Sequence, residues 1–265
     1  MSYIGPMVRI GKRSLGNFLY QFTMLENFRA ICRFPLVHEH PWQIFKDELL
    51  SRDVYPRDLH LRTPSGPTKI RLHHVADLST LNLIFAREDY YAPKSCEVVI
   101  DVGANIGLSA LYFLSRNQQT HVYAYEPAPT TFKKLEDNLA SYAQNVSLKQ
   151  CAVSDFSGVA TLGLEASGVY SALDLESAEK VEVECIDIMT VLHEVLAKHK
   201  RIDVLKLDCE GHEVRILNAI DDSMWEKIRC INVDAVFECP EVKDIVPKSY
   251  KRTQRGTALR FVQRS

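Results

Sequence analysis

The chain has 265 residues, of which 46% are hydrophobic and 25% charged, and this composition excludes a disordered or collagen-like protein. Its 32 basic and 34 acidic side chains leave a formal net charge of −2, so no overall positive field favours nucleic acid as a partner. The length allows one large domain, or one domain with an extension, and a core that needs no disulfide or metal to fold.

We expect an N-terminal extension over residues 1–75 and a main domain over residues 76–265. In the extension, large apolar side chains from Leu15 to Ile31 recur at spacings of three and four residues, which predicts an amphipathic helix. Residues 1–33 also carry a net charge of +4. The apolar face of this helix either covers the main domain, which we favour, or lies on a membrane of anionic lipid.

The sequence shows no signals for export or membrane insertion. No charged segment followed by an apolar core begins the chain, and no stretch of about 18 apolar residues occurs in it. Its seven cysteines form no C-x-x-C pair, and most lie in apolar runs, which favours buried free thiols over a zinc site. These features predict a cytoplasmic protein, because thiols stay reduced in that compartment.

Predicted strands and helices alternate along most of the chain. Strands at residues 59–63 and 69–72, joined by a Pro-Ser-Gly-Pro turn, precede residues 78–91, where a short helix is expected to run into an aromatic and acidic segment at residues 88–91. Further strands are expected at residues 98–100, 122–125, 146–152, 159–162, 181–185, 204–207 and 228–236. Helices are expected at residues 108–116, 130–142, 188–199 and 212–220. The alternation predicts an α/β fold, a doubly wound Rossmann-like sheet that binds its ligand at the carboxyl ends of the strands.

Residues suited to a nucleoside ligand follow the first three strands of the main domain. The segment Gly103 to Gly107 allows a tight turn in which backbone N–H groups approach a ligand. Asn105 stands where a dinucleotide site has its middle glycine, which disfavours an NAD-dependent oxidoreductase. Glu126 ends the second strand, where a carboxylate can accept both ribose hydroxyls of an adenosine. Ser154 and Asp155 can bind the adenine edge or form a plain turn.

A cluster of charged residues follows the buried strand at residues 204–207. Alternation along that strand places Lys206 and Asp208 on the same side, and Glu210 follows at its carboxyl end. Asp101 ends the first strand above the same cleft. Enclosed charges of this kind favour acid–base chemistry, although an acid such as Glu213 can simply cap the next helix.

Four segments together resemble the FkbM-type S-adenosylmethionine-dependent methyltransferases. They are VVIDVGANIG at residues 98–107, YAYEP at 123–127, AVSDFSG at 152–158 and DVLKLDCEGHE at 203–213. The resemblance covers residues 75–236 and implies a class I methyltransferase sheet of seven strands, for which we expect one antiparallel edge strand. It also implies S-adenosyl-L-methionine as methyl donor, S-adenosylhomocysteine as product, and a hydroxyl acceptor on a small molecule, often a sugar or a polyketide-like compound.

The resemblance also implies roles for single residues. It assigns the amino-acid end of the cofactor to Asp101, Gly103, Asn105 and Gly107, the ribose to Glu126, and the adenine to Ser154 and Asp155. We further expect Tyr91 or Tyr90 to close over the cofactor. Asp208 is the first candidate for the base that removes the acceptor's proton, with Glu210 and Lys206 shaping the charge of the pocket. Mg²⁺ held in part by Asp208 is the alternative, although the spacing shows no second and third ligand.

The end of the chain departs from the family pattern, in which an acid and a histidine often follow the fifth strand. Glu238, Cys239 and Pro240 stand there instead, and only 25 residues follow. Residues 257–262 can supply one strand, but the space for the helix and the second strand that the fold expects is tight. Because residues 243–265 carry a net charge of +6, the alternative function is a non-catalytic module on a degenerate methyltransferase fold. Its basic termini would give it a weak association with membrane surfaces.

Overall fold

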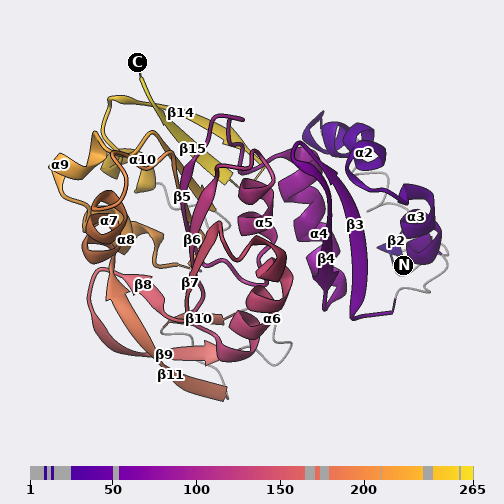
Figure 1. Ribbon diagram of the computed structural model, residues 1–265, viewed down its shortest axis with the longest axis horizontal. Helices are drawn as coiled ribbons and strands as arrows, with labels where there is room; N and C mark the ends of the chain where they lie inside the picture. The colour runs from indigo at the N-terminus through magenta and orange to yellow at the C-terminus, as the bar shows by residue number, and fades with distance from the viewer. Residues whose placement is uncertain are drawn as a thin grey trace, which may run out of the picture. The chain divides into compact units, whose positions relative to one another are not determined.

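The computed structural model describes residues 9–10, 13–14, 25–49, 54–164, 171–173, 179–209, 211–234, 241–256 and 258–264. The chain divides into two compact units, an N-terminal unit at Met1–Glu88 and a C-terminal unit at Asp89–Ser265. The division therefore comes after Glu88, whereas the sequence led us to expect it after residue 75. Figure 1 shows the elements of both units.

The N-terminal unit contains helices and a β-hairpin. Its elements are β1 (Arg9–Ile10), β2 (Arg13–Ser14), α2 (Leu25–Val37), α3 (Pro41–Leu49), β3 (Arg57–Thr63), β4 (Gly66–Leu72), α4 (Val75–Leu81) and the π-helix η1 (Asn82–Arg87). β3 and β4 pair in antiparallel fashion, which confirms both predicted strands and the turn between them. Residues 15–24 of the predicted amphipathic helix lie outside the described residues, and α2 forms its remainder.

A seven-stranded sheet forms the centre of the C-terminal unit, in the order β14-β15-β13-β12-β5-β6-β7. Its strands are β5 (Val98–Val102), β6 (His121–Tyr125), β7 (Val146–Lys149), β12 (Val204–Leu207), β13 (Cys230–Asp234), β14 (Tyr250–Arg255) and β15 (Ala258–Gln263). β15 runs antiparallel to both of its neighbours, and the other pairs are parallel. The predicted mostly parallel sheet is confirmed, but its antiparallel strand lies one place in from the edge, inside β14.

Helices cover both faces of this sheet. They are α5 (Leu108–Leu114), α6 (Pro129–Leu139), the short 3-10 helix η2 (Ala140–Tyr142), α7 (Ile188–Leu196), α8 (Glu213–Asn218), α9 (Asp222–Trp225) and α10 (Val242–Ile245). Figure 1 shows α5 and α6 on one side of the strands and α7, α8 and α9 on the other. Every residue of β5 and β12 is buried, which explains why these strands appear in the sequence as apolar runs. Among the described residues, no helix is long and apolar enough to cross a membrane.

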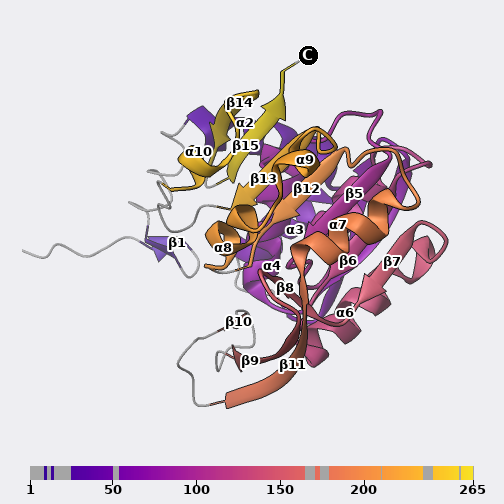
Figure 2. The ribbon, with the colours of Figure 1, turned by 90° about the vertical axis from the view of Figure 1, so that its left-hand side faces the viewer.

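The prediction of one strand at residues 146–152 is wrong, because this segment contains parts of two strands. β7 ends at Lys149, and β8 (Ala152–Ser154) belongs to a second sheet with β9 (Gly158–Leu164), β10 (Ser171–Leu173) and β11 (Glu179–Asp187). β8 pairs in parallel with the end of β11. After β7 the chain therefore leaves the main sheet and forms a second one, which Figure 2 shows beside it.

The expectation of a shortened C-terminus is also wrong. α10, β14 and β15 supply the helix and the strand pair within residues 242–263. They fit because Gly256, with a φ of +56°, allows a tight turn between the two strands. Tyr250 anchors the hairpin by donating a hydrogen bond to the backbone carbonyl of Trp225, at 2.6 Å. Because β14 and β15 complete the sheet, the length of the C-terminal segment no longer argues for a degenerate methyltransferase fold.

Candidate functional site

The turn after β5 approaches the neighbouring strand so closely that it requires a glycine. Gly103 has a φ of +72°, and a Cβ atom there would lie 1.9 Å from the backbone carbonyl oxygen of Asp208. The N–H groups of Gly103 and Ala104 both donate to the carbonyl of Tyr125, each at 3.0 Å. Because strand order reverses at β5, the ends of β5, β6 and β12 meet at this turn.

Asn105 bends the turn toward the end of β6. It adopts a φ of +49°, a conformation that asparagine tolerates better than most residues, and its side chain accepts a hydrogen bond from the N–H of Ile106. Its own N–H donates to Glu126 Oε2 at 2.9 Å. Gly107 then begins α5 with a φ of +93°. The predicted glycine turn and strand-end acid thus lie together.

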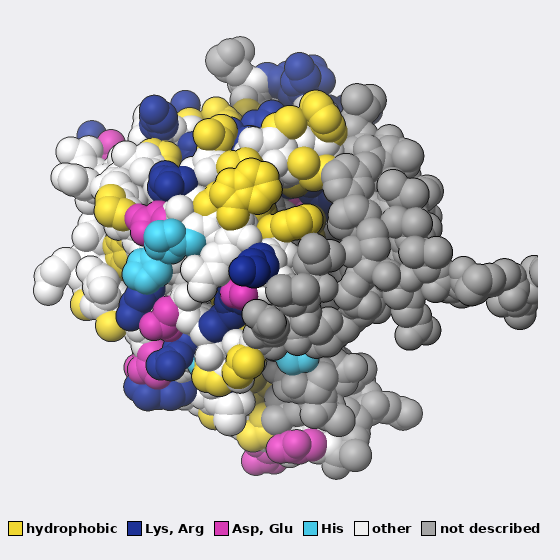
Figure 3. All heavy atoms as spheres, turned by 90° about the vertical axis from the view of Figure 1, so that its right-hand side faces the viewer, with side chains coloured by type: hydrophobic (Ala, Val, Ile, Leu, Met, Phe, Trp, Pro, Cys, Tyr) yellow, Lys and Arg dark blue, Asp and Glu magenta, His cyan; other side chains and the backbone are white. Residues whose placement is uncertain are grey.

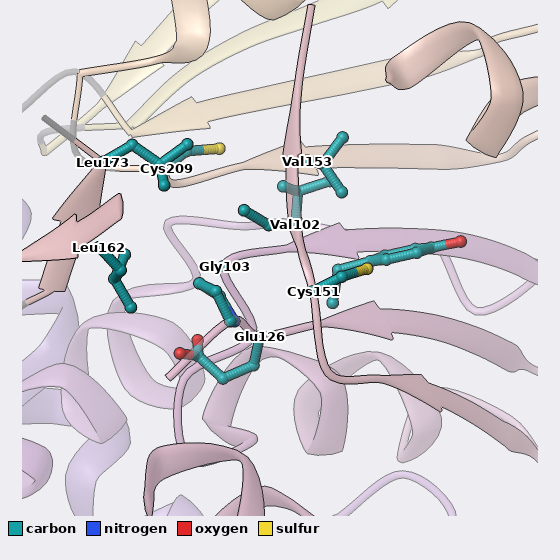
Figure 4. Close-up of a pocket in the computed structure, with 11 residues that line it drawn as sticks. Val102, Gly103, Glu126, Cys151, Val153, Leu162, Leu173 and Cys209 are labelled. Atoms are coloured by element: carbon teal, nitrogen blue, oxygen red, sulfur yellow. The ribbon is translucent and has the colours of Figure 1, made fainter. Parts of the chain in front are cut away.

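Glu126 presents a buried carboxylate at the end of β6. Besides the bond from Asn105, it accepts one from the N–H of Ala128 at 3.0 Å. Burial disfavours the charged form and raises the pKa of Glu126 to about 7. The carboxylate borders a pocket of about 50 Å³ whose lining includes Val102, Gly103, Val153, Leu162 and Cys209. Figure 4 shows it beside Gly103.

A buried ion-pair cluster holds the turn against β12. The ammonium of Lys206 lies 3.1 Å from Asp101 Oδ1 and 3.3 Å from Asp208 Oδ2, and it donates to the carbonyl of Gly103 at 2.7 Å. Burial opposes this charge, but the attraction of Asp101 and Asp208 outweighs it and raises the pKa of Lys206. Asp101 also accepts from the hydroxyl of Ser109 at 2.7 Å. Lys206 and Asp101 are fully buried, so they position the Gly103 turn and do not face the pocket themselves.

Replacing Lys206 by methionine is expected to destabilise the protein by about 3 kcal/mol, because Asp101 keeps a buried charge with Ser109 as its remaining donor. Burial already raises the pKa of Asp101, and removing the ammonium raises it further. A raised carboxyl pKa favours the protonated folded state, so the loss of stability should grow as the pH rises through that pKa. Urea unfolding at several pH values measures this, and the double variant Lys206→Met with Asp101→Asn should recover part of the loss. A loss independent of pH would contradict the assignment.

Tyr90 and Asp234 join this cluster, and Asp234 was not identified from the sequence. The Tyr90 hydroxyl donates to Asp234 Oδ2 at 2.9 Å and lies 3.3 Å from Asp208 Oδ2. Burial and the two carboxylates raise its pKa well above the ordinary value, so it remains a donor. Tyr91, which we expected beside the cofactor as the alternative to Tyr90, is exposed and lies under the guanidinium of Arg260.

Ser154 and Asp155 form a separate polar group at the end of β8. The Ser154 hydroxyl is buried, 3.1 Å from His212 Nδ1 and 3.0 Å from Asp155 Oδ1. Asp155 is exposed and pairs with Arg215 at 3.1 Å. Burial opposes its charge, but the hydrogen bonds from Ser154 and Arg215, with the positive charge of Arg215, together outweigh burial and lower the pKa of Asp155. No sequence pattern indicated His212, which α8 brings to β8.

The segment after β12 contains two further acidic residues, Glu210 and Glu213. Glu210 lies outside the described residues. Glu213 accepts hydrogen bonds from the N–H groups of Cys209 at 2.6 Å and Gly211 at 2.9 Å. It therefore closes the loop before α8 and does not cap the helix, since the N-cap residue is His212 and no side chain caps it. In the part of the chain that the structure describes, no three His, Cys, Asp or Glu side chains gather as a metal site.

Comparison with known proteins agrees with this geometry. Residues 101–247, more than half of the chain, match the Methyltransferase FkbM domain. The chain is 31% identical over 168 residues to methyltransferase sdnD of Sordaria araneosa, covering 51% of this chain and 65% of that protein. It is 30% identical over 207 residues to the 31-O-demethyl-FK506 methyltransferase FkbM of Streptomyces tacrolimicus, covering 64% and 78%.

A third relative is the hexuronic acid methyltransferase AglP of Haloferax volcanii, 28% identical over 132 residues, which cover 48% of this chain and 52% of that protein. The chain thus spans less than two thirds of the length of sdnD and AglP. The domain match begins at the carboxyl end of β5 and includes the turn, Glu126 and the Lys206 cluster. The chain belongs to the FkbM family of methyltransferases.

Proposed function

We propose that the protein transfers a methyl group from S-adenosylmethionine to a hydroxyl of a small-molecule or sugar-containing acceptor in the cytoplasm. The observation that carries the proposal is the buried Glu126 carboxylate, which borders a pocket beside the Gly103 turn. The names of two relatives, which specify a 31-O-demethyl compound and a hexuronic acid, support an oxygen acceptor on such a molecule. The free thiols of the described cysteines support a reducing compartment.

The residues present fit this cofactor. Gly103 brings the backbone close to the pocket, where a side chain would collide with the backbone of Asp208, directly after β12. Glu126 offers carboxylate oxygens for ribose hydroxyls. Ser154 and Asp155 stand at the end of β8 for the adenine edge. S-adenosylmethionine would supply a methyl group activated by a sulfonium, so the protein's part is to orient the donor and acceptor.

Asp208 is the proposed acceptor of the hydroxyl proton. Its side chain is 29% exposed, whereas those of Lys206 and Asp101 are buried, so it can reach a bound acceptor and they cannot. Lys206 and Tyr90 both contact Asp208 Oδ2 at 3.3 Å. These two residues position the carboxylate, and Asp208 can then receive a proton or hold Mg²⁺.

Calorimetric titration with S-adenosylhomocysteine tests the cofactor assignment. The wild type is expected to bind, and Glu126→Ala should weaken binding by about 1.5–3 kcal/mol, the usual range for hydrogen bonds to a charged group. Failure of the wild type to bind would refute the proposed function. An unchanged affinity in the variant would refute the ribose role of Glu126.

The affinity for S-adenosylhomocysteine should also depend on pH. Hydroxyl donors favour the ionised carboxylate, and the pKa of Glu126 is about 7 in the free protein. Affinity should therefore fall as the pH drops below 7, approaching about tenfold per pH unit. The positive charge of Lys206 lowers the pKa of Glu126, and the negative charge of Asp208 raises it. Glu126→Gln is the control and should bind weakly with little dependence on pH; an equal slope in both proteins would contradict the assignment.

A further inference from the structure

Two carboxylates lie side by side at the carboxyl ends of β12 and β13. Leu207 pairs with Val233 in the parallel register of these strands, so the residues that follow them, Asp208 and Asp234, are neighbours at the edge of the sheet. Like charges in neighbouring positions of a sheet repel each other and destabilise it. Departures of this kind from a stable arrangement are expected mainly at functional sites.

Acidic side chains on the molecular surface are surrounded differently. Figure 3 shows Asp and Glu side chains next to Lys and Arg side chains on one face of the molecule, where water and opposite charges stabilise them. Asp208 and Asp234 are instead partly enclosed. The group that contacts both of them is the hydroxyl of Tyr90, a residue that is itself buried.

Two distances decide which carboxylate receives the proton of the Tyr90 hydroxyl. The Tyr90 oxygen lies 2.9 Å from Asp234 Oδ2, within the usual range for an O–H···O hydrogen bond, and 3.3 Å from Asp208 Oδ2, beyond that range. A phenol has one proton to donate. Burial and the charges of Asp208 and Asp234 raise the pKa of Tyr90 well above the ordinary value, so the proton stays on it. Tyr90 therefore donates to Asp234 and turns a lone pair toward Asp208.

The ring of Tyr90 is held in place as well as its hydroxyl. The ammonium of Lys206 lies over this ring, 5.6 Å from its centre, within the range of a cation–π contact. The same ammonium lies 3.3 Å from Asp208 Oδ2. Because the ring cannot swing away without losing its contact with Lys206, Tyr90 presents a fixed oxygen to Asp208, whose side chain is exposed enough to reach an acceptor.

We propose that Asp234 is a positioning residue for methyl transfer, which acts by accepting the single proton of the Tyr90 hydroxyl. This inference rests on the proposed function, in which Asp208 removes the proton of the acceptor hydroxyl. If Tyr90 donated to ionised Asp208, it would stabilise that charge and oppose the uptake of a proton. With the Tyr90 proton held by Asp234, Asp208 takes the acceptor's proton as the acceptor oxygen bonds to the methyl carbon and that carbon separates from sulfur. Protonated Asp208 then donates a hydrogen bond to the Tyr90 oxygen.

Steady-state kinetics of Asp234→Asn give the first test, with an acceptor that the wild type methylates in a panel of sugars and other hydroxyl compounds. The variant keeps the shape of the side chain but loses its charge, and the Tyr90 proton turns to Asp208 because ionised acceptors form stronger hydrogen bonds. The kcat should fall about tenfold, since the base gains a hydrogen bond to its charged form. The KM for S-adenosylmethionine and the affinity for S-adenosylhomocysteine should not change.

A double variant shows whether Asp234 acts through Tyr90. Tyr90→Phe removes the hydroxyl and should also lower the kcat about tenfold, because protonated Asp208 loses its hydrogen-bond acceptor. In that background Asp234→Asn should cause no further loss, since no hydroxyl is left to orient. Losses that multiply to about a hundredfold in the double variant would overturn the proposal, because Asp234 would then act on the substrate or the fold by itself.

Calorimetry with S-adenosylhomocysteine separates this inference from the proposed function. A wild type that binds no S-adenosylhomocysteine, or methylates no acceptor in the panel, refutes the proposed function and the role of Asp234 with it. An active wild type whose kcat does not respond to Asp234→Asn overturns the role of Asp234 alone. Loss of S-adenosylhomocysteine binding in this variant would show a structural role and also overturn it. Asp222→Asn, at an exposed acid of α9, is the matched control and should keep the wild-type kcat.

Discussion

Replacing Gly103 by alanine should destabilise the protein by about 5 kcal/mol or more and abolish the binding of S-adenosylhomocysteine. The added Cβ would lie 1.9 Å from the backbone oxygen of Asp208, and neither partner can move away. β5 and β12 are paired along their lengths, and the N–H of Asp208 donates to the carbonyl of Val102. The clash must therefore separate two central strands or displace the turn that carries the pocket.

A variant at a second glycine distinguishes the clash with Asp208 from the effect of backbone strain alone. Gly158 has a φ of +149°, yet a Cβ atom there would meet nothing within 4 Å. Gly158→Ala should thus cost about 1–3 kcal/mol from strain and leave cofactor affinity nearly unchanged. Urea unfolding and calorimetry measure both variants. Equal losses of stability in the two would show that the contact with Asp208 has no special importance.

The central sheet was predictable because its strands are buried on both faces. β5, β6 and β12 occur as short apolar runs, and each of their predicted ranges falls within the observed strand. Once those strands were placed, the rule that ligands bind at their carboxyl ends indicated Gly103, Glu126 and the segment after β12. The structure brings these together through contacts that no periodicity specifies, such as the bond from the N–H of Asn105 to Glu126.

The missed residues depend on tertiary contacts or on the exact ends of strands. Asp234 is the last described residue of β13. The sequence predicted that this strand runs to residue 236, so Asp234 was not considered as an acid at the end of a strand. His212 reaches Ser154 only because α8 packs beside β8. The apolar periodicity of α2 predicted an amphipathic helix, but it could not show that Arg29 and Arg33 pair with Glu88.

The second large effect is expected from Asp208→Asn, which should lower the rate of methyl transfer by about 10²–10⁴-fold, the range for losing a positioned base. Asparagine has nearly the same shape and can still form a hydrogen bond with Tyr90, so the turn and the affinity for S-adenosylhomocysteine should be preserved. What it loses is the capacity to take a proton from the acceptor. An unchanged rate would exclude Asp208 from the chemistry.

Measuring this effect requires an acceptor, which a panel of sugars and other hydroxyl compounds with tritiated S-adenosylmethionine can supply. Asp222→Asn is the control, since Asp222 is exposed at the start of α9, and it should transfer methyl groups at the wild-type rate. Chelation distinguishes the two roles of Asp208. If Asp208 is the base, EDTA leaves the wild-type rate unchanged; if it is a ligand of Mg²⁺, EDTA lowers the rate, and added Mg²⁺ restores the wild type but not the variant. Either result keeps Asp208 at the reacting hydroxyl, because removal of the proton and stabilisation of the resulting alkoxide are both needed at that atom.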